Sequence, residues 1–175
     1  MCVMPFTPFH LGPALLFGLA LSAVFDLPTL LLASVIPDVE PFCAMYFHVQ
    51  GYPLHGFFHS YLGASILAIA VALIIYPLRD WVNRIMSIFR VSQKFSFRKI
   101  LFTSFVGVYS HVFLDSFLYG EMMPFYPLEV NPFYTLFTAY PVYTIIYGFC
   151  TVTGLFGIIL YAYLIGKRKS LELAK

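Results

Sequence analysis

The sequence predicts an all-α protein, a polytopic membrane helix bundle with four to five transmembrane segments, one of them short. Composition is the first observation behind this prediction: apolar residues make up 61% of the chain and charged residues only 10%, against about 25% charged residues in a typical soluble domain. Secondly, several apolar runs approach or exceed the roughly 18 residues that indicate a membrane-spanning helix. The length of 175 residues suits one domain, so residues 1–175 are expected to form a single integral membrane domain.

Turn and cap signals divide the chain into five apolar helices, the second of which is short. Their predicted ranges are 8–25, 29–36, 53–76, 100–119 and 141–165. Pro37 and Pro77 should end the second and third helices, because proline disfavours helical backbone in the residue before it. Gly166 is the expected C-cap of the last helix. Between the second and third helices, residues 37–41 predict a rigid extended acidic segment and residues 42–53 an aromatic loop.

Residues 79–99 differ in character from the apolar helices. Trp81, Ile85 and Phe89 are spaced by four, and basic residues occupy the other faces. This pattern is typical of an amphipathic helix on a membrane surface, with an ordinary basic loop as the alternative.

All ten Lys and Arg residues lie in two places, residues 79–99 and the C-terminal tail from Lys167. The positive-inside rule assigns both segments to the cytoplasmic side of the plasma (inner) membrane. The third helix then runs from outside to inside and the fourth returns, which puts the N-terminus outside and the C-terminus in the cytoplasm.

Charge and cysteine patterns exclude several functions. No basic stripe interleaved with polar residues occurs, so nucleic acid is not an expected partner. The three cysteines form no Cys-x-x-Cys pair, which argues against a thiolate metal site or a redox pair. Because the predicted outer face carries no Lys or Arg, a phosphatase that binds phosphate through such residues is excluded there.

Histidine and acidic residues gather at the predicted outer face. His55 and His59 stand four apart at the start of the third helix, and His111 and Asp115 repeat this spacing near the end of the fourth. Residues i and i+4 share one face of a helix. Ionisable groups inside a membrane are rare and mark functional sites, although a single hydrogen-bonded packing histidine is the simpler alternative.

Helices one and two bring further candidates to the same depth, given a rise of about 1.5 Å per residue. The candidate metal ligands are His10, Asp38, His55, His59, His111 and Asp115. Asp38 and Glu40 are the candidate catalytic residues, either as a general base or as groups that orient a ligand. Imidazole and carboxylate donors without thiolate suit a divalent metal, Zn²⁺ first, with Mn²⁺ or Fe²⁺ as alternatives.

Four motifs follow one another over residues 10–127. They are His10-Leu-Gly, Ile36-Pro-Asp-Val-Glu40, His55-Gly-Phe-Phe-His-Ser60 and Ser110-His-Val-Phe-Leu-Asp-Ser116, the last followed by Pro124 and Pro127. The ordered set resembles the membrane-bound metal-dependent hydrolase family, which includes LexA-regulated inner-membrane proteins assigned as hydrolases. The sequence departs from the family pattern at two positions. Glu40 replaces an Asp, and His55 is one residue closer than usual to the second histidine of its motif, His59.

A looser similarity exists to zinc-dependent phospholipase C, in which Asp, His and His-x-x-x-Asp ligands follow in this order. The later His-x-x-x-Glu ligands of that enzyme have no counterpart here, because no His follows His111. Glu121 or Glu129 would be the nearest substitutes.

The resemblance and the candidate site together predict a metal-dependent hydrolase at the outer leaflet. Its expected substrate and partner is a membrane lipid or lipid-linked molecule, cleaved at a phosphoester or ester. A proton- or metal-coupled transporter that uses the same residues is one alternative, favoured by the short second helix. A non-catalytic membrane scaffold with a structural metal is the other.

Overall fold

The computed structural model describes residues 8–49, 51, 53–136 and 141–173, and these contain no β-strand. Three of its helical stretches are long and apolar enough to cross a membrane: Leu27–Tyr46, Tyr61–Ile88 and Pro141–Arg168. A shorter apolar helix covers Pro8–Ala20. The prediction of an all-α membrane bundle is confirmed.

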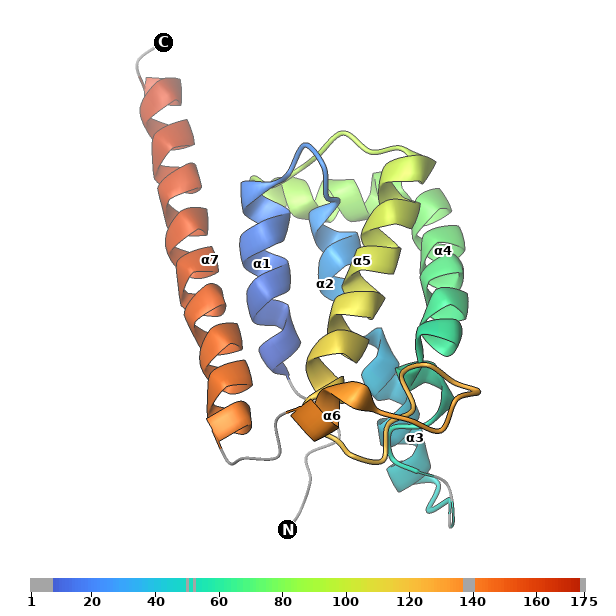
Figure 1. The fold of residues 1–175 in the computed structure, drawn as a ribbon. Coiled ribbons are helices and arrows are strands. Elements are labelled where there is room, and N and C mark those ends of the chain that lie inside the picture. The colour runs from blue at the N-terminus through green and yellow to red at the C-terminus, as the bar shows by residue number, and fades with distance from the viewer. Residues whose placement is uncertain (1–7, 50, 52, 137–140, 174–175) are drawn as a thin grey trace.

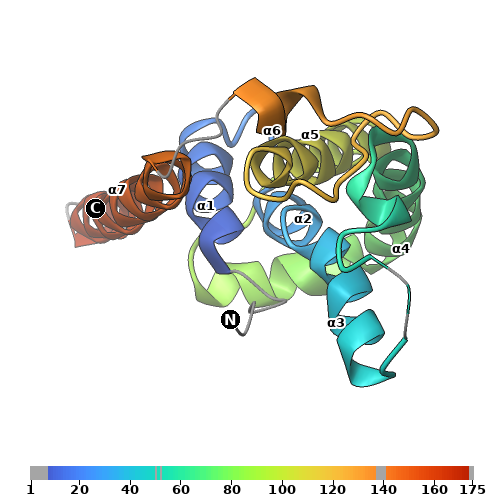
Figure 2. The ribbon, with the colours of Figure 1, turned by 60° about the horizontal axis from the view of Figure 1, so that its bottom comes forward.

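Seven α-helices and three 3₁₀ turns follow one another along the described part of the chain. They are η1 (Pro8–His10), α1 (Leu11–Ala20), α2 (Leu27–Ala33), η2 (Ile36–Asp38), α3 (Val39–Tyr46), η3 (Phe57–His59), α4 (Tyr61–Ile88), α5 (Phe97–Ser116), α6 (Pro132–Leu136) and α7 (Pro141–Leu173). Helix α2 packs against α1, α4 and α5, while α7 packs against α1 at the edge of the bundle (Figures 1 and 2).

The extended acidic segment predicted for residues 37–41 is wrong. Pro37 lies in the first turn of η2 and Pro41 in the first turn of α3. Proline is tolerated in a first turn, since the N–H groups there have no partner within the helix. The segment therefore stays helical and carries Asp38 into the bundle, and α3 also takes up the first part of the predicted aromatic loop.

The third predicted helix, 53–76, begins later and ends later than expected. Ser60 is the N-cap of α4, where its hydroxyl accepts the Gly63 N–H at 3.0 Å. His55 and His59 consequently precede the helix, and the premise that they share one helical face is wrong. Pro77 lies inside α4, and the later part of α4 turns across one end of the bundle (Figures 1 and 2). A proline kink of this kind is tolerated in membrane helices.

Other predicted boundaries shift by smaller amounts. The first helix ends at Ala20, and α5 begins at Phe97 after the N-cap Ser96. Helix α7 continues past Gly166 to Leu173. A single internal glycine costs only about 1 kcal/mol, and most of the residues that follow are good helix formers.

A buried ion pair joins α4 to the turn between α1 and α2. The Arg79 guanidinium donates three hydrogen bonds of 2.8–3.1 Å to the Asp26 carboxylate. Thr29 donates to the same carboxylate at 2.5 Å, and the guanidinium lies 5.2 Å from the centre of the Phe95 ring. Asp26 and Arg79 are both fully buried. In the sequence, Arg79 stands out only as one of the basic residues of 79–99, and no pattern there predicts this pair.

The two basic segments lie at one end of the bundle, and the start of α1, the start of α4 and the end of α5 lie at the other (Figure 1). Tyr161 of α7 donates to the Phe89 carbonyl at 3.1 Å, and Arg168 donates to the Arg90 carbonyl. The predicted separation of charge is therefore present in the described part of the fold, which excludes Lys175. The assignment of the basic end to the cytoplasm stays a prediction.

We expect Asp26→Ala to destabilise the protein by about 3–5 kcal/mol, because the substitution leaves the buried Arg79 charge without its partner. The matched control is Asp80→Ala, which removes an exposed carboxylate from α4 and should leave stability nearly unchanged. Thermal unfolding of the detergent-solubilised protein, followed by circular dichroism, measures both. Equal melting temperatures for the two variants would contradict the structural role of the pair.

Candidate metal centre

Four buried side chains meet at the end of the bundle away from the basic segments. Asp38, His59, His111 and Asp115 each offer one ligand atom, and these atoms all lie within 4.8 Å of one another. None of the four residues is more than 2% exposed. They come from η2, η3 and α5, segments that are separated in sequence and that the fold brings together.

Helix α5 supplies two members of the group from one face. His111 Nε2 lies 3.2 Å from Asp115 Oδ2, as expected for residues i and i+4. The predicted helical spacing of this pair is confirmed. His59 approaches from η3, with its Nε2 3.4 Å from His111 Nε2 and 4.0 Å from Asp115 Oδ2. Asp38 Oδ1 completes the group at 3.5 Å from His111 Nε2.

Hydrogen bonds fix how the two imidazole rings face this group. His59 Nδ1 lies 2.8 Å from Glu40 Oε2, and His111 Nδ1 lies 2.7 Å from the Ser34 carbonyl oxygen. Because a carboxylate and a carbonyl accept hydrogen bonds, each Nδ1 carries the proton. In a neutral ring the Nε2 lone pair is then free to bind a metal. Both lone pairs point into the space among the four side chains.

Two further features concern Glu40 and His59. The Phe58 N–H donates to both Glu40 oxygens at 3.1 Å, which holds the carboxylate in place. Burial lowers the pKa of the His59 imidazole to about 4, although the hydrogen bond to Glu40 acts in the opposite direction. The His59 ring is therefore neutral near pH 7, the protonation state that a metal ligand requires.

His10 lies at the edge of the group of four. Its Nε2 is 3.0 Å from Asp115 Oδ1, and its ring packs on the His111 ring with centroids 4.1 Å apart. Its Nδ1 is buried without a hydrogen-bond partner among the described residues. This geometry suits a residue that positions the Asp115 carboxylate, and it leaves the predicted role of His10 as a direct ligand untested.

His55 is separated from the group of four. Its Nδ1 lies 2.9 Å from Glu121 Oε1, and its ring stacks on Tyr119 at 3.7 Å. The hydrogen bond with His55 lowers the pKa of Glu121, although partial burial acts in the opposite direction. His55 diverges from His59 because the backbone between them is a loop followed by a 3₁₀ turn, in which residues four apart do not share a face.

Several contacts of the site carried no signal in the sequence. Ser34 acts through its backbone carbonyl, which a sequence pattern does not reveal, and Tyr119 contributes an aromatic face. Glu121 was expected only as a substitute zinc ligand, whereas it contacts His55. Glu129 is exposed and lies outside the group of four.

The donor set of the group is chemically informative. Two imidazole nitrogens and two carboxylates, without a thiolate, form a set that binds Zn²⁺ and also suits Mn²⁺ or Fe²⁺. Two unprotonated nitrogens and two carboxylates at these distances repel one another unless positive charge lies among them, either a bound cation or a proton on His111 Nε2. The four residues therefore fit a divalent cation.

Comparisons with known proteins agree with a membrane location. The family model described as YdjM inner membrane protein matches residues 4–172. The match fits the resemblance to LexA-regulated inner-membrane proteins, and no comparison extends it to hydrolases or to phospholipase C. No curated protein and no solved structure matched the chain. Because the match covers nearly the whole chain, this protein belongs to the YdjM inner membrane protein family.

Proposed function

We propose that this protein is a membrane-embedded metal-dependent hydrolase in which Asp38, His59, His111 and Asp115 bind a divalent cation. The observation that carries the proposal is the approach of two Nε2 atoms to 3.4 Å while both Nδ1 atoms are engaged elsewhere. Two Nε2 lone pairs at this distance repel one another unless a proton or a metal ion lies between them, and the approach supports the proposal because two histidine ligands of one ion come this close. Zn²⁺ is the first candidate for the nitrogen and oxygen donors, and Mn²⁺ or Fe²⁺ also suit them.

A bound zinc-type ion would supply Lewis-acid polarisation and activation of water. The protein's own part is to fix the ligands, and Glu40 and the Ser34 carbonyl orient the two imidazoles. The Glu40 carboxylate already accepts hydrogen bonds from His59 and Phe58, which supports an orienting role for Glu40 rather than a general-base role. Asp38 faces the group directly and is proposed as a ligand.

The proposed substrate is a membrane lipid or lipid-linked molecule in the outer leaflet. Hydrolysis adds water across a phosphoester or ester bond, the leaving oxygen takes a proton, and no redox cofactor is needed. The site lies at the opposite end of the bundle from both basic segments. Because no described Lys or Arg is therefore close to it, the bound cation would neutralise an anionic oxygen of the substrate. A pocket of about 250 Å³ is lined by His55, Gly56 and Glu121, among others. It lies next to the site, because the ring of His55 meets that of His59 at 4.8 Å.

A structural metal is the second candidate function. The specific observation in its favour is burial, because His59 and His111 are completely inaccessible and the two carboxylates nearly so. A structural ion has all its coordination positions filled by the protein, whereas a catalytic ion keeps one open. Turnover and stability of metal-free protein separate the two functions.

We expect His59→Ala and Asp115→Ala to lose most bound metal, because each removes a donor from the group of four. His55→Ala is the matched control and should retain the metal, since His55 contacts Glu121 instead. Glu40→Gln should weaken binding by about 10–100-fold through the loss of the carboxylate that orients His59. Elemental analysis of purified protein and competition with a chelator measure these effects. Full metal content in His59→Ala would show that the site is misassigned.

A topology experiment tests the outer-face location. In a chain whose native cysteines are replaced by serine, Ser87→Cys and Ser170→Cys should resist an impermeant maleimide in intact cells, because both belong to the basic end. Glu129→Cys, on the exposed loop at the other end, should react. The opposite labelling pattern would place the metal centre at the cytoplasmic face.

Hydrolysis itself is tested with metal-loaded protein and a mixed lipid extract, analysed for released headgroups and diglycerides by mass spectrometry. Chelation should abolish turnover, and Zn²⁺ or Mn²⁺ should restore it. Asp38→Asn should reduce turnover and metal content together if Asp38 is a ligand. A loss of turnover with full metal content would instead make Asp38 a general base. If no lipid or soluble ester is cleaved with any metal, and metal-free protein unfolds, the structural role is the correct one.

A further inference from the structure

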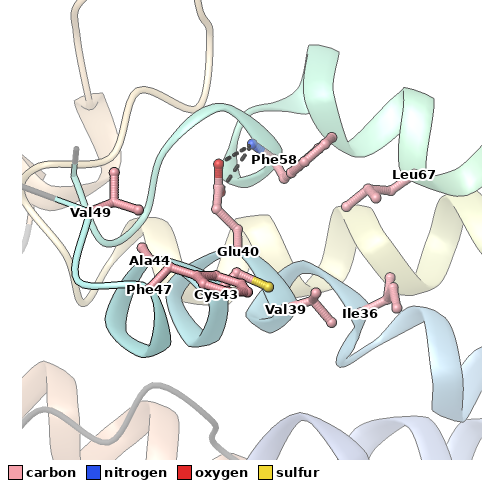
Figure 3. Close-up of a pocket in the computed structure, with 9 residues that line it drawn as sticks. All are labelled: Ile36, Val39, Glu40, Cys43, Ala44, Phe47, Val49, Phe58 and Leu67. Atoms are coloured by element: carbon pink, nitrogen blue, oxygen red, sulfur yellow. Dashed lines mark hydrogen bonds between the residues drawn. The ribbon is translucent and has the colours of Figure 1, made fainter.

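An apolar pocket of about 410 Å³ opens beside the proposed metal centre (Figure 3). Its lining residues are Ile36, Val39, Glu40, Cys43, Ala44, Phe47, Val49, Phe58 and Leu67. Glu40 is the one charged residue among them. The walls otherwise consist of aliphatic and aromatic side chains and one cysteine, so the pocket favours an apolar occupant.

Glu40 separates this pocket from the proposed metal centre. Its carboxylate faces the Phe58 backbone nitrogen, while the side chains of Cys43, Val39 and Ile36 extend along the adjoining helices (Figure 3). The same carboxylate lies 2.8 Å from His59 Nδ1. A molecule in the pocket would therefore have its apolar part along η2 and α3 and one end close to the proposed metal ligands.

The pocket opens beside exposed apolar side chains. Five of its nine lining residues belong to Leu27–Tyr46 and one, Leu67, belongs to Tyr61–Ile88, two of the stretches able to cross a membrane. At its rim, Phe47 is 69% exposed and Val49 is 50% exposed. In an inner membrane protein such a surface is covered by lipid, so lipid is the material available to fill the pocket.

We propose that this pocket binds one acyl chain of a membrane phospholipid and holds the ester groups of that lipid beside the metal centre. That the bound lipid is the substrate rests on the proposed hydrolase function. That an acyl chain binds here rests on the pocket alone. A phosphate is disfavoured in the pocket, because Glu40 is the one charged residue among the described lining residues and would repel it. An acyl chain needs no hydrogen bond, and its placement leaves the polar end of the lipid toward His59.

The test uses full-length protein in lipid nanodiscs that contain a phospholipid with a photoreactive diazirine in one acyl chain. After irradiation, adducts are mapped by mass spectrometry and should concentrate on the pocket residues. Ala44→Phe, which fills the pocket, should reduce these adducts by roughly tenfold, equivalent to about 1.4 kcal/mol of binding free energy. Met45→Phe is the matched control on the same helix, since Met45 does not line the pocket, and should leave the adducts unchanged.

Leu67→Trp fills the same pocket from α4 and should reduce the adducts in the same way. It provides a second test if Ala44→Phe does not fold. Metal content of each variant confirms that the neighbouring centre is intact. Adducts spread evenly over exposed apolar residues of α7, or preferential labelling by a photoreactive polyprenyl phosphate, would overturn the acyl-chain assignment.

Cleavage of a soluble short-chain phosphoester distinguishes this inference from the proposed function. If the short-chain ester is cleaved while pocket adducts are absent, the acyl-chain inference fails and the hydrolase proposal stands. If pocket adducts form and no ester of any length is cleaved, chain binding is supported and the hydrolase proposal fails.

Discussion

The charge balance among Asp38, His59, His111 and Asp115 is the constraint on which this end of the molecule depends. Two carboxylates and two imidazoles are enclosed in an apolar bundle, where uncompensated charge is strongly unfavourable. They come from segments that otherwise diverge: α2 leads into η2, η3 leads into α4, and α5 ends there. A cation shared by all of them would join these segments, so folding of this end and occupancy of the site would be coupled.

The groups around the four residues explain why the arrangement is specific. An imidazole with a free Nδ1 can rotate or change tautomer, whereas Glu40 and the Ser34 carbonyl fix both rings so that Nε2 faces inward. His10 restrains one oxygen of Asp115 in a similar way. Ser34 and Glu40 flank Asp38 in sequence, so the segment that carries one of the four residues also orients the two imidazoles. Such outer contacts commonly determine metal affinity as much as the ligands do.

The sequence was informative where the signal was periodic or compositional. Apolar runs were enough to predict the helical bundle, and the spacing of His111 and Asp115 correctly predicted a shared helical face. The same spacing failed for His55 and His59, because Ser60 caps α4 after both histidines. Pro37 and Pro41 suggested extended backbone, but each occupies a first turn that tolerates proline. The Asp26–Arg79 pair joins residues 53 positions apart, a distance over which no local pattern operates.

Helix α4 is held by polar contacts at its start and just after its kink: His59 of the group of four lies just before the helix, and the buried Arg79 lies two residues after Pro77. These residues are 20 positions apart, or about 30 Å at the rise of an α-helix. That length is close to the hydrocarbon thickness of a typical bilayer. Both anchors are rigidly tied to other helices, which limits how far α4 can tilt to follow a thinner or thicker membrane. A mismatch between the length of α4 and the bilayer thickness would therefore act on both anchors at once. Because lipid composition determines that thickness, a change in composition would alter the geometry of the site.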